Sequence, residues 1–253
     1  MPYNHLVHQD NAYEEFVSLR TEFSTRPPTY QFLLRMCRGI RMFGCFSLFV
    51  DADVLTFSKC LQVSGRCFEH FLPLIPKEQQ VTSRATPLLD AIACCDFDGA
   101  SLISRNLSST RNQSVEYEED FLYFQFLLEV FFRSGDENDC RRLLNSYERV
   151  IEENHDNRLD VARALLDRDA SAFDSALCAL IAQYKDYYSR MRVAAALPEA
   201  ALISEGKIFI EGLALIRLAE RRGLKVDHEY PMIPSLTRQD FSTNFQADEW
   251  RAY

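Results

Sequence analysis

The stretch that decides the fold is SEGKIFIEGLALIRLA, residues 204–219. Read with a helical period, it is apolar on nearly every side, which predicts a central buried helix rather than a surface helix. Gly206 and Gly212 each cost about 1 kcal/mol relative to alanine inside a helix, so they predict a closely packed neighbouring helix. Glu205 and Glu211 would be buried charges there, and we expect arginines of neighbouring helices to pair with them.

Helical signals continue on the N-terminal side of this stretch, from residue 86 onward. Thr86 and Pro87 form a helix start, with proline at the first helical position. Asp98, Asp136 and Asp169 recur where each could cap the second helix of a two-helix unit. We therefore predict an all-α fold of helical hairpins, packed as a bundle or as a short repeat-like array. Chance similarity between helices of similar composition is the alternative explanation of the repeat.

The same signals predict the domain organisation. Pro198 is expected to open the last long helix and Gly223 to end it. Residues 1–223 are then a single all-helical domain, in which the helices of residues 1–75 have the less sharply marked ends. Residues 224–253 contain prolines and scattered aromatics without a sustained helical period. We expect them to form an extended, irregular C-terminal tail that either wraps the body or stays mobile.

The N-terminal part contains two further features. Asn11 and Glu14 resemble a capping box, which predicts a helix that opens at Asn11 and runs to about Phe23. The apolar run at residues 42–50 fits either a buried helix or a strand. It could belong to the core or to a dimer surface.

Composition narrows the classes of function. The chain has 253 residues, with 37 Asp and Glu against 28 Lys and Arg and a formal net charge of −9. This acidity disfavours a nucleic-acid binder and favours a basic partner. With only 8 Gly and 9 Pro, an all-β fold is disfavoured. Neither a membrane-spanning run nor a secretory signal is visible, so we expect a cytoplasmic protein whose eight cysteines are mostly small core residues.

One cluster of side chains is a candidate for partner binding. It combines four carboxylates and two tyrosines around the start of a strongly apolar helix: Glu116, Tyr117, Glu118, Glu119, Asp120 and Tyr123. The helix dipole favours carboxylates in a first turn, and this is a sufficient structural explanation of the cluster. As a functional site, the cluster would suit contact with a basic partner surface.

The sequence has no Gly-rich phosphate loop, nucleophile elbow or His-Glu-x-x-His zinc helix. One enzyme hypothesis rests on His70, His155 and Asp156, because imidazole and carboxylate ligands suit a divalent metal in a phosphohydrolase. Asp160 or Asp227 would complete the ligand set. The polar surroundings of Asp156 favour a helix cap instead. We therefore predict no catalytic residue, metal site or cofactor.

Residues 204–224 and the following segment Tyr230-Pro231-Met232-Ile233-Pro234-Ser235-Leu236 resemble the C-terminal signature of the immunity protein 49 family of bacterial polymorphic toxin systems. That signature combines an apolar helix carrying acidic–Gly pairs, a Gly-Leu stop and a Pro-x-x-Pro stretch. In this chain the matching positions are Glu205-Gly206, Glu211-Gly212, Pro231 and Pro234. The resemblance is clearest over residues 80–238 and thin in the first 75 residues.

The resemblance implies a cytoplasmic, all-helical, non-enzymatic protein that binds a toxin encoded beside it and blocks its action, which protects the producing bacterium and its kin. We expect this cognate toxin to be the partner and to present a basic surface, with no nucleic acid, membrane or cofactor involved. Two other classes stay open. One is a helical-repeat adaptor with several weak partners, and the other is an HD-like metal-dependent phosphohydrolase using His70, His155 and Asp156.

Overall fold

The computed structural model describes residues 5–23, 25–152, 154–226, 229–239, 246 and 248–253. Over these residues the chain is helical, without a strand, apart from an isolated bridge between Tyr230 and Ile233. The all-α prediction is confirmed. The α-helices are α1 (His5–Phe23), α2 (Tyr30–Asp51), α3 (Val54–Phe71), α4 (Thr86–Ala93), α5 (Phe97–Asn106), α6 (Glu118–Phe131), α7 (Glu137–Ile151), α8 (Asn157–Asp167), α9 (Ala170–Val193), α10 (Glu199–Ile203) and α11 (Ile210–Arg221). The 3₁₀ helices are η1 (Leu72–Leu74), η2 (Lys77–Gln79), η3 (Thr82–Arg84), η4 (Glu205–Lys207), η5 (Ser235–Arg238) and η6 (Glu249–Ala252).

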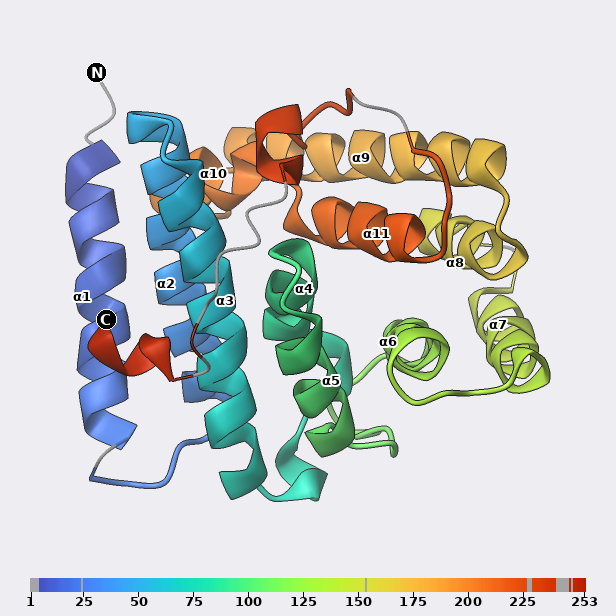
Figure 1. The fold of residues 1–253 in the computed structure, drawn as a ribbon, viewed down its shortest axis with the longest axis horizontal. Coiled ribbons are helices and arrows are strands. Elements are labelled where there is room, and N and C mark those ends of the chain that lie inside the picture. The colour runs from blue at the N-terminus through green and yellow to red at the C-terminus, as the bar shows by residue number, and fades with distance from the viewer. Residues whose placement is uncertain (1–4, 24, 153, 227–228, 240–245, 247) are drawn as a thin grey trace.

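Helices α1, α2 and α3 stand side by side, with alternating direction, as a layer at one end of the molecule (Figure 1). Thr29 caps α2 by accepting a hydrogen bond from the amide of Phe32 at 3.3 Å. Asp53 caps α3 in the same way, accepting from the amide of Thr56 at 2.9 Å. These caps satisfy amides that the first turn of each helix leaves unpaired.

Helix α1 begins at His5, so the predicted start at Asn11 is wrong. Gln9, upstream of the predicted cap, is buried and donates a hydrogen bond from Nε2 to the hydroxyl of Ser47 on α2 at 3.0 Å. Packing of this first turn against α2 extends the helix past a local capping signal, as tertiary contacts commonly do.

The ambiguous apolar run at residues 42–50 is helical and forms the C-terminal half of α2. Most of it belongs to the core, and Phe46 is fully buried. Gly44 allows α3 to approach, since a Cβ there would lie 2.6 Å from the Cβ of Cys60. Only the last residues of the run, Phe49 and Val50, are exposed.

Three helical hairpins follow along the described chain: α4–α5, α6–α7 and α8–α9 (Figure 1). The second helix of each has an aspartate cap, at Asp96, Asp136 and Asp169, which accepts backbone amide hydrogen bonds at 2.7–3.0 Å. The predicted hairpins are confirmed with one correction, because Asp96 rather than Asp98 caps α5. Helix α9 lies across the direction of α2 and α3, so the hairpins change direction instead of stacking as parallel copies.

The decisive stretch at residues 204–219 is not one helix. Helix α10 ends at Ile203, η4 follows, and α11 begins only at Ile210. The prediction of a buried central helix is therefore confirmed for α11, which packs against α4 (Figure 1), and is wrong for residues 204–209. Pro198 opens only the short helix α10.

Beyond α11, the described parts of the C-terminal segment wrap the body. Gly223 has φ +79°, a left-handed conformation that glycine adopts without strain, and it reverses the chain after the helix. Tyr230 and Ile233 are buried beside α11. The last turn, η6, crosses α1 and α3 (Figure 1), where Trp250 packs edge-on against Phe71.

The described residues also show how the cysteines are buried and whether any helix could cross a membrane. Five of the eight cysteines are buried core residues, as predicted: Cys37, Cys45, Cys60, Cys67 and Cys140. Burial raises the pKa of each of these thiols, which disfavours the reactive thiolate. Within the described ranges, every helix is too short or too polar to cross a membrane.

Candidate functional site

The break in the decisive stretch creates a linker, residues 204–209, between α10 and α11. Ser204 leaves the helical conformation (φ −111°, ψ −89°), and its hydroxyl donates a hydrogen bond to the carbonyl of Ala200 at 2.5 Å. At the other end, the amide of Phe209 donates to the carbonyl of Met232 at 2.9 Å. The linker is thus bonded to the Pro-x-x-Pro segment instead of continuing the helix.

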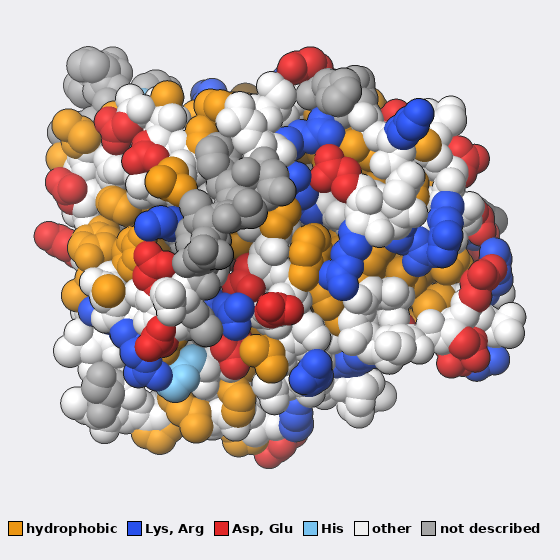
Figure 2. All heavy atoms as spheres, viewed as in Figure 1, with side chains coloured by type: hydrophobic (Ala, Val, Ile, Leu, Met, Phe, Trp, Pro, Cys, Tyr) orange, Lys and Arg blue, Asp and Glu red, His pale blue; other side chains and the backbone are white. Residues whose placement is uncertain are grey.

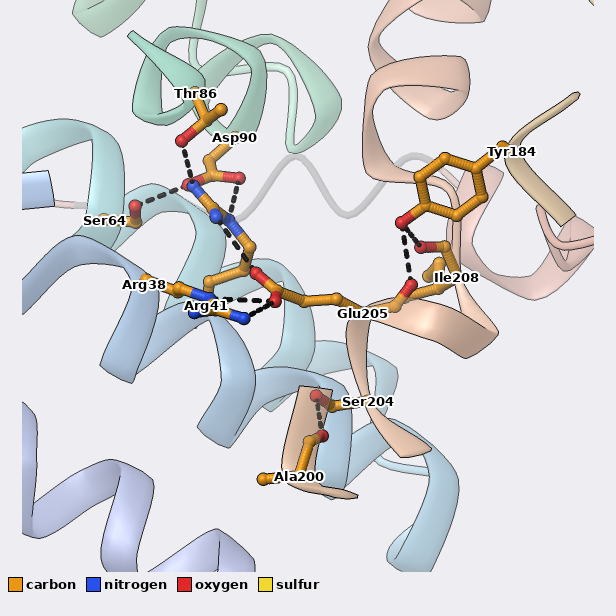
Figure 3. A network of polar contacts seen from close by, with 10 residues as sticks. All are labelled: Arg38, Arg41, Ser64, Thr86, Asp90, Tyr184, Ala200, Ser204, Glu205 and Ile208. Carbon is orange, nitrogen blue, oxygen red and sulfur yellow. Dashed lines mark hydrogen bonds and ion pairs between the residues drawn. The ribbon is translucent and has the colours of Figure 1, made fainter. Parts of the chain in front are cut away.

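Glu205 projects from the linker to α2, where two arginines bind it (Figure 3). Its Oε2 accepts from Arg38 at 2.9 Å (Nε) and 2.6 Å (Nη2), and its Oε1 lies 3.3 Å from Nη1 of Arg41. The predicted pairing of Glu205 with arginines of a neighbouring helix is confirmed. These ion pairs connect the linker to the N-terminal layer.

Arg41 also binds Asp90 of α4 (Figure 3) through two parallel hydrogen bonds of 2.7 Å. The hydroxyl of Ser64 donates to the same carboxylate at 2.5 Å, and Nη2 of Arg41 donates to Oγ1 of Thr86 at 2.9 Å. Burial acts to lower the pKa of Arg41, but the carboxylates of Asp90 and Glu205 outweigh it and raise this pKa above its ordinary value. Arg41 is therefore a permanent buried cation that joins α2, α4 and the linker.

An inner pocket of about 180 Å³ lies beside this network, with Arg41, Asp90, Glu205 and Tyr184 among its lining residues. The hydroxyl of Tyr184 donates to the backbone carbonyl of Glu205 at 2.8 Å. The side-chain charges of Arg41, Asp90 and Glu205 are already bonded to one another. The inner pocket is therefore a structural junction.

Glu211, on the first turn of α11, differs from Glu205. No described residue forms an ion pair with it within 4.0 Å; the arginine that acts on it is Arg158 of the neighbouring helix α8, from beyond that distance. Its Oε1 atom is buried without a hydrogen bond of standard geometry to a described residue, and the same holds for the hydroxyl of the nearby Tyr123. Burial raises the pKa of Glu211, opposed by the charge of Arg158 and by the Tyr123 hydroxyl.

Arg158 at the start of α8 organises the neighbouring polar cluster. Its Nη2 lies 2.8 Å from Oδ2 of Asp156, and its Nη1 lies 2.7 Å from Oδ1 of Asp120. Its guanidinium also covers the ring of Tyr123, with 5.2 Å between the guanidinium carbon and the ring centroid. The hydroxyl of Tyr147 donates to Asp156 at 2.6 Å. This cluster holds α6, α7 and α8 together.

An outer pocket of about 490 Å³ opens between this cluster and α9. The polar and charged residues of its lining include Glu119, Asp156, Arg158 and Glu211. Its aromatic lining residues are Tyr184, Tyr187 and Phe209. The volume lies within the range of pockets that bind small molecules or a protruding side chain.

The residues of the predicted acidic cluster have different environments. Glu116 is buried, and its carboxylate accepts backbone amide hydrogen bonds from Ser83 at 2.7 Å and Asn112 at 2.8 Å. Tyr123 is also buried, so neither of these two reaches the surface. A direct partner contact by Glu116 or Tyr123 would require an opening of the fold.

The other members of the cluster are accessible. Tyr117 is 73% exposed, and Glu118 pairs with Arg111 at 2.9 Å. Glu119 lines the outer pocket. Asp120 binds Arg158, as described above. Partner binding by these four residues stays a prediction.

The glycines of the signature make room for side chains, Gly206 for the ring of Tyr188 on the neighbouring helix α9 and Gly212 for Phe209 and Ile233, which lie outside any α-helix. A Cβ at Gly206 would lie 2.6 Å from Cδ1 of Tyr188, and one at Gly212 would meet Phe209 and lie 2.7 Å from Cδ1 of Ile233. Pro231 lies inside the turn that is bridged from Tyr230 to Ile233, and Pro234 follows this turn and precedes η5. All four positions therefore serve the packing of the linker against its surroundings.

The residues of the phosphohydrolase hypothesis are not brought together. His70 stacks against Trp250 at the end of α3, whereas His155 precedes α8 and lies near Asp160, with 3.4 Å between Nε2 and Oδ2. Asp156 caps α8, as the sequence favoured. Asp227 lies outside the described residues. Over the described ranges, no group of three or more His, Cys, Asp or Glu side chains is arranged to hold a metal ion.

The sequence model of a protein family described as immunity protein 49 matches residues 25–236. The chain belongs to the immunity protein 49 family. Comparisons with curated proteins and with solved structures give no match. The match to immunity protein 49 begins before α2, so α2 and α3 of the N-terminal layer are part of the family region, whereas α1 lies before it.

Sequence reasoning missed Asp90 and Arg158, which hold the two polar clusters of this immunity protein 49 chain. Asp90 stands in the apolar run TPLLDAIA, residues 86–93, where a lone carboxylate gives no signal of its partner. Arg38 and Arg41 gave a partial signal, because Arg35, Arg38 and Arg41 recur at a spacing of three on one helix face.

Proposed function

We propose that this protein binds one cognate bacterial toxin and neutralises it by covering a surface that the toxin needs. The observation that carries the proposal is the match of an immunity protein family over residues 25–236. The toxin belongs to a polymorphic toxin system, and the complex forms in the cytoplasm of the producing cell. In this mechanism the immunity protein acts by binding, without turnover.

Charge supports a partner with a basic surface. The chain carries a net charge of −9, which favours association with a cationic surface and raises the association rate by steering. Tyr117, Glu118 and Glu119 are accessible aromatic and acidic side chains at the start of α6. Tyr187 is an exposed aromatic side chain on α9. Tyrosines are common anchors of protein interfaces.

The experiment that tests this proposal is affinity capture of the tagged chain from the bacterium that makes it, read by mass spectrometry and by the stoichiometry of the captured complex. We expect a single tight partner with a toxin domain. A diffuse set of weak partners would contradict the proposal and support the adaptor alternative.

Titration distinguishes occlusion from an enzymatic mechanism. When the captured toxin is assayed with increasing amounts of the chain, occlusion predicts that inhibition is complete at one equivalent. Complete inhibition far below one equivalent would show that the chain turns over, and would contradict direct binding as the mechanism.

A further inference from the structure

The cations of the outer pocket are already paired. Arg158 is bound by Asp156 and Asp120, at 2.8 Å and 2.7 Å. Arg190, on the α9 side of the pocket, lies 2.9 Å from Asp186 one turn earlier on the same helix. Arg158 is therefore largely neutralised by its two carboxylates, whereas Arg190 shares an exposed pair with Asp186 that is weaker.

Two carboxylates of the pocket lack such a partner. Among the described residues, no cation lies within ion-pair distance of Glu119 or Glu211, although both line the outer pocket. The Oε1 atom of Glu211 is buried against the Tyr123 side and makes no hydrogen bond of standard geometry there. This leaves Oε2 as the oxygen able to meet a guest. Burial disfavours the charged form of Glu211, and Arg158 offsets this only from beyond ion-pair distance, so a cationic guest would stabilise the carboxylate.

Aromatic rings supply the walls between these carboxylates. Tyr184 and Phe209 pack against each other, with 4.3 Å between ring centroids. Tyr187, which is 42% exposed, stands at the accessible side of α9. A planar guanidinium stacks on aromatic faces and bonds carboxylates through two parallel donors, whereas a lysine ammonium does neither as well.

We infer that the outer pocket receives an arginine side chain of the toxin, which would be bonded by Glu119 and Glu211 and stacked on Tyr187. This inference rests on the proposed function and names the interface that the function uses. The chemistry of the pocket selects the guest, because its free groups are anionic and aromatic. The inner pocket also borders Glu211, but it suits an arginine guest less well, because it is smaller and Arg41, the cation in its lining, is bound to Asp90 and Glu205.

A direct test uses N-acetyl-arginine methylamide as the probe, titrated into the full chain labelled with fluorotyrosine. The Tyr187 resonance is identified by its loss in Tyr187→Phe. We expect a saturable shift of this resonance with a dissociation constant in the millimolar range, which is typical of an isolated side chain. The citrulline analogue, of equal shape but neutral, should bind at least about tenfold more weakly. Absence of a saturable shift, or equal binding of both probes, overturns the inference.

Variants then place the toxin on the same pocket. Glu211→Gln, Glu119→Gln and Tyr187→Ala should each weaken binding of the captured toxin by about tenfold or more, as loss of an interface anchor does. Glu137→Gln is the matched control, because Glu137 is also a first-turn glutamate but is exposed on α7 and pairs with Arg141 outside the pocket lining, and it should leave the affinity unchanged. Tyr187→Ala and Glu119→Gln change accessible side chains, so they keep the test valid if Glu211→Gln fails to fold.

The outcomes separate this inference from the proposed function. If the wild-type chain binds the toxin tightly and all three pocket variants bind it equally well, the inference is overturned and the proposed function stands. If the wild-type chain captures no toxin, the proposed function fails and the inference fails with it. Binding of the arginine probe together with weakened toxin binding by the pocket variants supports both.

Discussion

At the scale of single residues, the ion pair between Arg41 and Asp90 is the most consequential contact. Their side chains are 8% and 1% exposed, so removing one partner leaves the other as an uncompensated buried charge. We expect Asp90→Asn and Arg41→Met each to lower the free energy of unfolding by about 3–5 kcal/mol. Urea unfolding followed by circular dichroism measures this change.

The matched control is Arg142→Met, because Arg142 pairs with Asp139 on the exposed surface of α7. An exposed pair of this kind contributes about 0.2–1 kcal/mol or less. If Asp90→Asn were as mild as Arg142→Met, the Arg41 network would not hold the helices together as described.

Glu211 leads to a prediction about pH. Burial raises its pKa, and the groups that face it are Tyr123, Arg158, Asp156 and Asp120. The folded protein therefore holds the proton of Glu211 more tightly than the unfolded chain does, and this contribution to stability is lost as the pH rises through the raised pKa. Replacing Glu211 by Gln removes that loss. The free energy of unfolding of Glu211→Gln minus that of the wild type should therefore be more positive at about pH 8 than at about pH 5.

Urea unfolding at both pH values measures this difference, with Glu118→Gln as the control for loss of an exposed carboxylate near the same cluster. If the free energies of unfolding of Glu211→Gln and Glu118→Gln had the same pH dependence, Glu211 would not be held in the buried environment described.

The sequence predicted the partners of some of these buried carboxylates and not of others. A carboxylate in an apolar segment must be paired, and this rule correctly gave Glu205 arginine partners. For Glu211 the same rule did not predict a direct ion pair correctly, because it concerns free energy and does not specify geometry: Arg158 acts on Glu211 from beyond ion-pair distance. The partner of Asp90 was missed, because a lone carboxylate in an apolar run does not identify the residue that pairs with it, here Arg41.

At the scale of elements, the linker shows where periodicity misleads. Residues 204–209 have the apolar pattern of a helix, but Glu205 is bound by two arginines of α2 and the amide of Phe209 is bound by Met232. These contacts come from distant parts of the chain, so no local pattern could reveal them. The hairpins were predictable for the opposite reason, because aspartate caps such as Asp136 and Asp169 act within three residues.

Gly212 allows a test at this scale. Alanine at this position of α11 would gain helix propensity, worth up to about 1 kcal/mol. Its Cβ would meet the buried Phe209 and lie 2.7 Å from Cδ1 of Ile233, and such overpacking costs about 1–3 kcal/mol. We expect Gly212→Ala to lower the thermal midpoint, as measured by calorimetry. Addition of Ile233→Val, which removes the Cδ1 atom, should recover part of the loss. An increase in the midpoint for Gly212→Ala alone would contradict the packing of the linker.

At the scale of the whole molecule, the C-terminal segment is attached to the layer that begins the chain. Trp250 is 6% exposed and packs against His70 and Phe71, while Arg20 donates hydrogen bonds to the carbonyls of Trp250 and Arg251. We expect Trp250→Ala to lower the free energy of unfolding by about 3 kcal/mol, as loss of a buried aromatic does. Leu236→Ala, at a residue that is 39% exposed, is the control. Equal effects of the two substitutions in urea unfolding would contradict the docking of the tail.

Net charge also has to be considered for the whole molecule and for each face. The sequence carries an acidic excess, yet Figure 2 shows a row of Lys and Arg side chains over the half of one face formed by α7, α8 and α11. A net charge of −9 therefore does not describe each surface, and we propose the outer pocket as the place where a basic partner binds. Fold class and family followed from the sequence because they depend on many residues, whereas the pocket joins side chains from α6, α8, α9 and α11 that only the folded chain brings together.

The most direct test of the central claim is the binding isotherm of the purified chain with the purified toxin domain identified by capture, measured by titration calorimetry. We expect one toxin per chain and a dissociation constant of about 10 nM or tighter, as is typical of stable inhibitory complexes. A dissociation constant in the micromolar range or weaker, or the absence of binding heat over a range of temperatures, would contradict this claim.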